Sequence, residues 1–141
     1  MHAILMNEAP ALQWHQPVMG AEVLQALNPR PGAIVVDGTL GTGGHSLMLL
    51  PRLLPDGRLV AIERDQEALE LARKRLAEFE PQAVFLHGNY RHLPAVLQEL
   101  QIPRIDGLLL DLGMSSVQVD CAERGFSFSR EGPLDMRMDR E

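Results

Sequence analysis

The chain has 141 residues, 45% of them hydrophobic, and a formal net charge of −6 at pH 7. This length supports a single domain with one core, and the composition excludes a disordered or fibrous chain. The acidic balance argues against a free-standing nucleic-acid binder, because such proteins usually present a basic face.

The N-terminal part of the chain shows no targeting signal. Residues 1–14 form a leader of unassigned role, and no basic segment precedes an apolar run there, so a secretion signal is not expected. No apolar run approaches the ~20 residues that a membrane-spanning helix needs. The single cysteine, Cys121, excludes an internal disulfide and a cysteine zinc site. Together these features favour a cytoplasmic location and no membrane partner.

From residue 18 to residue 111 the pattern alternates between helix and strand. A short helix is predicted over residues 18–27, where apolar residues recur on one face, and Pro29 and Pro31 end it. Apolar runs predict four strands, at residues 33–37, 58–63, 83–87 and 105–111. Three further helices are predicted between the strands: one after the glycines near residue 41, which Pro51 ends or kinks, one capped by Asp65, and one around residues 93–100.

This alternation predicts the fold class α/β with a doubly wound parallel sheet. The leucines at residues 108–110 are typical of a strand that is covered on both faces. After Asp111 the pattern predicts no clear helix or strand. Four strands make a small sheet for this architecture, so we expect an incomplete sheet and a chain that is part of a longer protein.

A glycine-rich loop follows the first predicted strand. The run from Val35 to His45 reads VVDGTLGTGGH, in which an apolar strand ends in an acid and glycines then let backbone N–H groups approach a ligand. The loop lacks the Lys-Ser/Thr of a Walker A motif, and it reads G-x-G-G rather than the G-x-G-x-x-G of dinucleotide binders. Asp37 would repel a pyrophosphate, and it suits an ammonium-bearing cofactor such as S-adenosylmethionine (SAM). The alternative is that the loop only links a strand to a helix.

Three polar residues lie where the other predicted strands end. Glu63 follows the second strand and is placed to accept hydrogen bonds from both ribose hydroxyls of an adenosine cofactor, with a solvated edge residue as the alternative. Tyr90 follows the third strand and is a candidate to stack on the adenine, although buried packing explains it equally well. Asp111 ends the fourth strand and is predicted to face the reacting centre, unless it caps a helix.

The remaining candidates have simpler interpretations. His45 is interpreted as a hydrogen-bonding group rather than a metal ligand or base, and the other histidines show no metal-ligand spacing, so no metal site is predicted. Ser115 and Ser116 have no identifiable partner histidine and are interpreted as turn or cap residues. The arginines near the C-terminus alternate with acids, which predicts internal ion pairs rather than a phosphate-binding stripe. They are Arg124, Arg130, Arg137 and Arg140.

Five segments resemble one family, the SAM-dependent methyltransferases that methylate N4 of a cytidine in bacterial small-subunit ribosomal RNA. They are residues 15–18 (HQPV), 37–46 (DGTLGTGGHS), 106–120 (DGLLLDLGMSSVQVD), 123–128 (ERGFSF) and 132–139 (GPLDMRMD). The resemblance runs over nearly the whole chain, and the last three segments are long and unusual. It implies the Rossmann-like class I methyltransferase fold for residues 15–141, as the N-terminal part of a SAM-binding domain. The later strands of its seven-stranded sheet and an inserted helical substrate-recognition domain are expected to be absent from this chain.

The resemblance also implies cofactor contacts and a reaction centre. The implied cofactor contacts are Gly43, Gly44, His45, Glu63, Tyr90, Asp111 and Gln118. Asp111 is the candidate catalytic residue, and its contact with the SAM ammonium, the target amine or both is left open. Four residues depart from the family pattern: Thr42 stands for Arg, Glu63 for Asp, Tyr90 for Phe and Val117 for Pro. The exchanges at Glu63 and Tyr90 keep the chemistry, whereas valine is expected to hold the Gln118 loop less firmly than proline.

We expect the full-length protein to act on small-subunit ribosomal RNA and the 141-residue piece alone to be inactive. One alternative is a nicotinamide-dependent dehydrogenase on the same sheet, which Asp37 and the loop spacing oppose. Another is a non-catalytic methyltransferase-like module that binds RNA or a partner protein, which an intact Glu63 opposes. Because the fourth strand would present a bare apolar edge in this piece, self-association is expected, while the native oligomeric state is left open.

Overall fold

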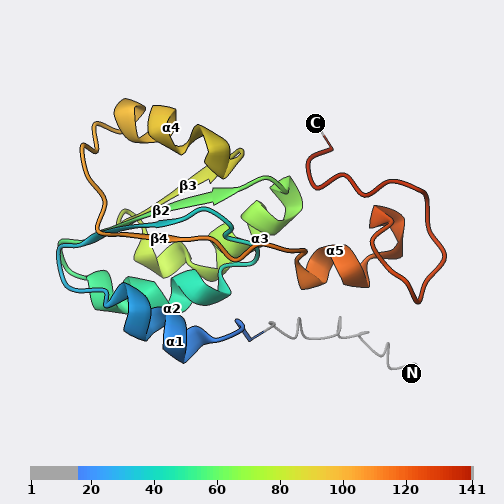
Figure 1. Ribbon diagram of the computed structural model, residues 1–141, viewed down its shortest axis with the longest axis horizontal. Coiled ribbons are helices and arrows are strands. Elements are labelled where there is room, and N and C mark those ends of the chain that lie inside the picture. The colour runs from blue at the N-terminus through green and yellow to red at the C-terminus, as the bar shows by residue number, and fades with distance from the viewer. Residues whose placement is uncertain (1–15, 141) are drawn as a thin grey trace, which may run out of the picture.

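The computed structural model describes residues 16–140, so the predicted leader at residues 1–14 and His15 lie outside the described part. The described residues form a sheet of four parallel strands (Figure 1). The strands are β1 (Ile34–Asp37), β2 (Arg58–Glu63), β3 (Ala83–His87) and β4 (Gly107–Leu109). Their order across the sheet is β3-β2-β1-β4, so the winding direction reverses between β1 and β4. Doubly wound sheets bind their ligands at the carboxyl ends of the strands beside such a reversal.

Helices cover both faces of the sheet (Figure 1). They are α1 (Gly20–Leu27), α2 (Gly44–Leu53), α3 (Gln66–Arg75), α4 (Leu93–Glu99) and the short α5 (Ser116–Asp120). Helices α1, α2 and α3 pack on one face and α4 packs on the other, whereas α5 lies beyond the carboxyl ends of the strands. Within residues 16–140, no helix is long and apolar enough to cross a membrane.

Successive residues of the central strands point to opposite faces of the sheet. Val35, Leu59 and Ala61 join the core that α2 and α3 cover. Val36 and Val60 join the smaller core that α4 covers. All five side chains are at most 1% exposed. The near-continuous apolar runs of β1 and β2 therefore reflect burial on both faces, as parallel strands require.

The predicted strand positions are largely confirmed. Strands β2 and β3 have the predicted bounds, and β1 begins one residue later than predicted. Helix α3 begins after Asp65, whose carboxylate accepts hydrogen bonds from the backbone N–H groups of Glu67 and Ala68, so its predicted role as a cap is confirmed.

Helix α2 runs through Pro51 to Leu53, so Pro51 does not end it, and a kink, the other predicted outcome, remains a prediction. A proline removes one backbone hydrogen bond and crowds the preceding turn. Leu53 is fully buried, like Leu49 and Leu50 earlier in the helix. Burying a leucine contributes about 1.5–3 kcal/mol, which favours keeping the last turn in place.

Strand β4 lies at the edge of the sheet, and its structured part is shorter than the predicted residues 105–111. In the described residues it pairs only with β1, and the side chains of Leu108 and Leu110 are 42% and 40% exposed. The prediction that these leucines are covered on both faces is therefore wrong for this part of the chain. The bare apolar edge is present, and self-association through it remains a prediction.

Helix α5 occurs where the pattern predicted no clear element. Ser115 caps it by accepting a hydrogen bond from the backbone N–H of Gln118, and the Gln118 side chain in turn accepts one from the backbone N–H of Ser115. This reciprocal arrangement is a capping box, and the Ser-x-x-Gln spacing was the available signal for it. The interpretation of Ser115 as a cap residue is confirmed.

Candidate functional site

A cleft of about 480 Å³ opens where the four strands end. Its walls are the loops that follow β1, β2, β3 and β4, together with Pro17 and Val18 ahead of α1 and Met138 near the C-terminus. The volume suits a ligand of nucleoside size. Of the predicted cofactor contacts, all but Gly43 line the cleft: Gly44, His45, Glu63, Tyr90, Asp111 and Gln118. Their contacts with a cofactor remain predictions.

The glycine-rich loop after β1 makes the sharp turn that its sequence predicts. Gly41 and Gly43 have φ values of +54° and +82°, in the left-handed region that favours glycine. The backbone N–H of Gly41 donates to Oε2 of Glu63 at 2.6 Å, and the N–H of Leu40 donates to the carbonyl of Ile62 at 3.1 Å. The loop is therefore tied directly to the end of β2.

Gly43 shapes this loop from below rather than lining the cleft. A Cβ at Gly43 would lie 2.9 Å from Cδ1 of Leu76, whose side chain is fully buried, whereas a Cβ at Gly41 would meet nothing within 4 Å. We expect Gly43→Ala to lower the free energy of unfolding by about 3 kcal/mol, from backbone strain plus overpacking.

The matched control, Gly41→Ala, should lose only about 1 kcal/mol, because it adds strain without a clash. Equilibrium denaturation in urea measures both. Equal losses in the two variants would show that the contact with Leu76 does not matter.

Glu63 lies at the end of β2, with its carboxylate at the mouth of the glycine loop. Its Oε1 accepts hydrogen bonds from the backbone N–H groups of Arg64 and Asp65 at 2.8 and 2.9 Å, while Oε2 faces Gly41. Three backbone donors thus fix the direction of the carboxylate. A carboxylate has about four acceptor positions, so one position, on Oε2, stays free for a hydroxyl donor.

Asp37 is buried beneath the loop and does not line the cleft. Its carboxylate accepts hydrogen bonds from the Ser46 hydroxyl at 2.7 Å and the backbone N–H of Thr39 at 3.2 Å. Burial raises the pKa of Asp37 to about 6, although these hydrogen bonds and the nearby His45 act in the opposite direction. Asp37 therefore affects the cleft only through the glycine loop that it holds. The prediction that it directly repels a pyrophosphate required contact with the ligand, and its buried carboxylate does not reach the cleft.

Asp111 follows β4 and presents an exposed side chain to the cleft. Its backbone N–H donates to Oγ1 of Thr39 at 2.7 Å, which joins the loops after β4 and β1. Nδ1 of His45 lies 3.8 Å from Oδ2 of Asp111, and Nε2 of His45 lies 2.9 Å from the carbonyl oxygen of Val18. Because a carbonyl only accepts, Nε2 carries the hydrogen in this contact. His45 therefore has the predicted hydrogen-bonding role, which it plays toward the segment ahead of α1, and its ring also lies beside the acid that follows β4.

Gln118 lines the cleft, but its amide is already engaged on both sides. Oε1 accepts from the backbone N–H of Ser115 at 3.1 Å, and Nε2 donates to Oδ2 of Asp65 at 2.9 Å. Both hydrogen bonds of Gln118 are present although Val117 stands where the family pattern has proline. Gln118 is 2% exposed, and its amide links Ser115 at the start of α5 to Asp65 in the loop between β2 and α3.

The prediction that the C-terminal arginines form internal ion pairs is confirmed for Arg124 and Arg137. Arg137 pairs with Asp135 within the C-terminal segment, with Nε and Oδ1 2.8 Å apart. Arg124 instead reaches Asp65 and Glu67 at the start of α3, and the sequence contains no local signal for contacts between residues so far apart. The roles of Thr39 and Met138 at the cleft were also missed, since each depends on how distant segments meet.

A metal centre finds no support in this part of the chain. Within residues 16–140, no group of three or more His, Cys, Asp or Glu side chains is placed to hold a metal ion. The cleft instead combines backbone donors with two carboxylates, those of Glu63 and Asp111.

Comparison with known sequences points to a single family. The family model described as "MraW methylase family" matches residues 12–141. A "Ribosomal RNA small subunit methyltransferase H" of Geobacter sulfurreducens is 53% identical over 124 residues, which are 88% of this chain and 40% of the relative. A protein of the same name from Thermobifida fusca is 53% identical over 137 residues, covering 95% of this chain and 40% of the relative. The chain therefore spans about two-fifths of the length of these relatives.

Solved structures share the fold. The C-terminal domain of precorrin-6Y C5,15-methyltransferase from Rhodobacter capsulatus is 27% identical with a TM-score of 0.55, covering 78% of this chain and 56% of that one. A SAM-dependent O-methyltransferase from Thermotoga maritima is 18% identical with a TM-score of 0.51, covering 56% of this chain and 32% of that one. Because the O-methyltransferase is only 18% identical to this chain, its similarity shows a shared fold alone.

Proposed function

Because the chain belongs to the MraW methylase family, we propose that the whole protein transfers a methyl group from SAM to N4 of a cytidine in small-subunit ribosomal RNA. The described sheet has the class I SAM-dependent methyltransferase fold, and SAM is the cofactor of this family and fold. The relatives' names support ribosomal RNA as the substrate. The cytidine N4 target rests on the five sequence segments that resemble the family.

One observation carries the proposal: the Glu63 carboxylate is fixed against the glycine loop at the carboxyl ends of β2 and β1. A carboxylate at the end of the second strand is placed to bind a ribose, and the free acceptor position on Oε2 can take one of its hydroxyls. Tyr90 borders the same cleft and offers an aromatic face or edge for an adenine. The acid at Asp111 favours a ligand with positive charge. The residues of the cleft therefore fit SAM.

The chemistry follows from what these side chains can do. SAM supplies an electrophilic methyl group, so the protein mainly has to position the acceptor. The N4 lone pair of cytidine is delocalised into the ring, and an acceptor for the amine hydrogens would help to orient it. The exposed carboxylate of Asp111 is the candidate, with the loop from Gly113 to Gln118 beside it. The target base has to leave its stack to reach this position.

The proposal is tested by calorimetric titration with SAM and by methylation of small ribosomal subunits, with the protein in its natural full length. We expect SAM to bind, NADH not to bind, and the product to carry methyl groups on cytidine N4. Binding of NADH in place of SAM would support the dehydrogenase alternative. Binding of SAM without methyl transfer would support the non-catalytic module.

The 141 residues by themselves are proposed to be inactive in methyl transfer, because they span about two-fifths of the relatives' length. The same methylation assay on the isolated 141 residues measures this. Robust turnover would contradict it.

A further inference from the structure

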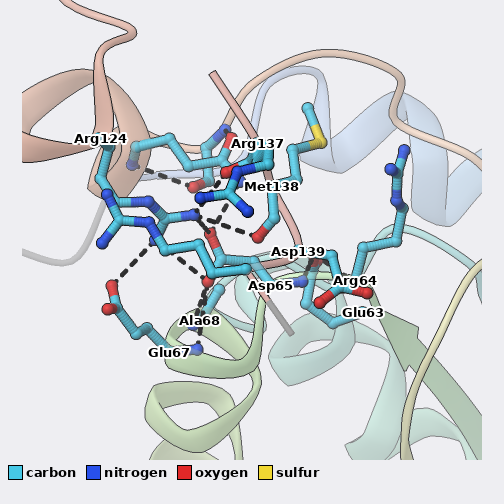
Figure 2. Close-up of polar contacts among 12 residues, drawn as sticks. Glu63, Arg64, Asp65, Glu67, Ala68, Arg124, Arg137, Met138 and Asp139 are labelled. Atoms are coloured by element: carbon cyan, nitrogen blue, oxygen red, sulfur yellow. Dashed lines mark hydrogen bonds and ion pairs between the residues drawn. The ribbon is translucent and has the colours of Figure 1, made fainter. Parts of the chain in front are cut away.

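Arg124 is 1% exposed, although it belongs to a short 3-10 turn, Ala122–Arg124, that follows α5. Its guanidinium reaches the start of α3 (Figure 2). Nη2 donates to Oδ2 of Asp65 at 2.6 Å and Nη1 to Oδ1 at 3.3 Å, and Nη1 also donates to Oε2 of Glu67 at 2.9 Å. An arginine charge is buried only where such partners replace its water.

The same guanidinium holds the segment at residues 137–139. Nη2 of Arg124 donates to the main-chain carbonyls of Arg137 and Met138 at 3.3 and 3.1 Å (Figure 2). The next residue, Asp139, lies 3.8 Å from Nε2 of His87 at the end of β3. Met138 lines the cleft, so this segment forms part of the cleft wall.

The partner of Arg124, Asp65, connects to two further parts of the cleft. The backbone N–H of Asp65 donates to Oε1 of Glu63 at 2.9 Å. Oδ2 of Asp65 also accepts from Nε2 of Gln118, whose side chain holds the loop at Ser115. One buried carboxylate thus joins the β2–α3 loop to α5, and Arg124 joins both to the segment at residues 137–139.

Asp65 and Arg124 each stabilise the ionised form of the other. Burial alone would raise the pKa of Asp65, but the hydrogen bonds from Arg124 and Gln118 and the charge of Arg124 outweigh it and hold that pKa below its usual range. The hydrogen bond with Asp65 likewise raises the pKa of Arg124. Both groups therefore stay ionised, and the contact is a pair of charge-assisted hydrogen bonds in the fork geometry that only arginine offers.

We propose that Arg124 is a positioning residue of the cofactor site, which orients Glu63 toward the ribose hydroxyls by holding the loop at Asp65 and which also anchors the wall at Met138. The inference rests on the proposed function, because the ribose is that of the SAM cofactor. Lysine cannot replace Arg124, since one ammonium cannot donate in parallel to Asp65 and also reach Glu67 and two carbonyls.

The test compares Arg124→Lys with wild type in the protein's natural full length. The ligands are S-adenosylhomocysteine and its 2′-deoxy analogue, which lacks one hydroxyl that Glu63 would accept. In wild type the 2′-deoxy analogue should bind about tenfold more weakly, as expected for a hydrogen bond to a charged group. In Arg124→Lys the affinity for S-adenosylhomocysteine should fall about tenfold, and the preference for the 2′-hydroxyl should largely disappear.

The matched control is Arg130→Lys, which makes the same exchange at an exposed arginine that donates to the carbonyl of Asp120. This control should keep both the affinity and the tenfold preference. Because Arg124→Lys also removes contacts that hold the fold, titrations are made well below the melting temperature, with folding checked by circular dichroism. The ratio of the two affinities is independent of the folded fraction. Asp65→Asn, which keeps the shape of the side chain and removes its charge, should lower the same ratio.

Different results overturn different conclusions. If Arg124→Lys melts earlier but keeps the tenfold preference, Arg124 only stabilises the fold and the inference is wrong. If Arg124→Lys fails to fold and Asp65→Asn keeps the preference, the inference is also wrong. If wild type binds neither ligand, the proposed function itself fails, and the inference fails with it.

Discussion

Replacing Glu63 by alanine is expected to weaken SAM binding by about 100-fold or more. The carboxylate is held by backbone donors from Gly41, Arg64 and Asp65, so it is oriented before any ligand arrives. A hydrogen bond to a charged group contributes about 1.5–3 kcal/mol, and a ribose hydroxyl would form one at the free position of Oε2. The variant also frees the loop N–H of Gly41 from its partner, which adds to the loss. Isothermal titration with SAM measures the effect.

Two further variants at Glu63 separate the effect of its negative charge from the effect of its side-chain length. Glu63→Gln keeps the length and removes the charge, so it should retain a better affinity than alanine but a worse one than wild type. Glu63→Asp shortens the side chain by one methylene and restores the residue usual in the family pattern, so it should bind SAM nearly as well as wild type. Unchanged binding and methylation by Glu63→Ala would remove the ribose role of Glu63 and favour the non-catalytic alternative.

Asp37→Asn is expected to raise the free energy of unfolding by about 3 kcal/mol at pH 7.5. Burial raises the pKa of Asp37 to about 6 from a model-peptide value of 3.8, so ionising this carboxyl costs more in the folded protein than in the unfolded chain. Because the folded pKa is raised, the stability that Asp37 contributes is complete below about pH 4 and is lost as the pH rises through 6. An asparagine, which does not ionise, avoids that loss. Its amide can still accept from Thr39 and donate to the Ser46 hydroxyl.

The difference between Asp37→Asn and wild type should therefore shrink toward zero near pH 4. Urea denaturation of both proteins between pH 4 and 8 measures it. The control is Asp56→Asn, at an exposed acid in the turn before β2, which should change stability by no more than about 0.5 kcal/mol at any of these pH values. A constant difference across the range would contradict the account, because packing rather than ionisation would then be the cause.

Much of the sheet could be predicted because its signals are local. The apolar runs of β2 and β3 end at the predicted residues, and Asp65 caps α3 through bonds to its own near neighbours. The structure departs from the simplest expectation where local signals conflict with packing. Pro51 disfavours a helix, but the burial of Leu53 keeps the last turn of α2. The leucines near residue 109 suggest a covered strand, but β4 lies at an edge of the described sheet.

The amino-acid sequence encodes locally the alternation of strands and helices, the glycine loop, and the acids that follow β2 and β4, because each depends on residues adjacent in the chain. From these features alone Glu63, Tyr90 and Asp111 could be expected at one edge of the sheet. Which groups meet at that edge depends on how the chain folds. The fold buries Asp37 beneath the loop, engages both ends of the Gln118 amide, and places Arg124 against Asp65, 59 residues away. The energy of a buried charge depends on partners that distant segments supply, and no local pattern encodes those partners.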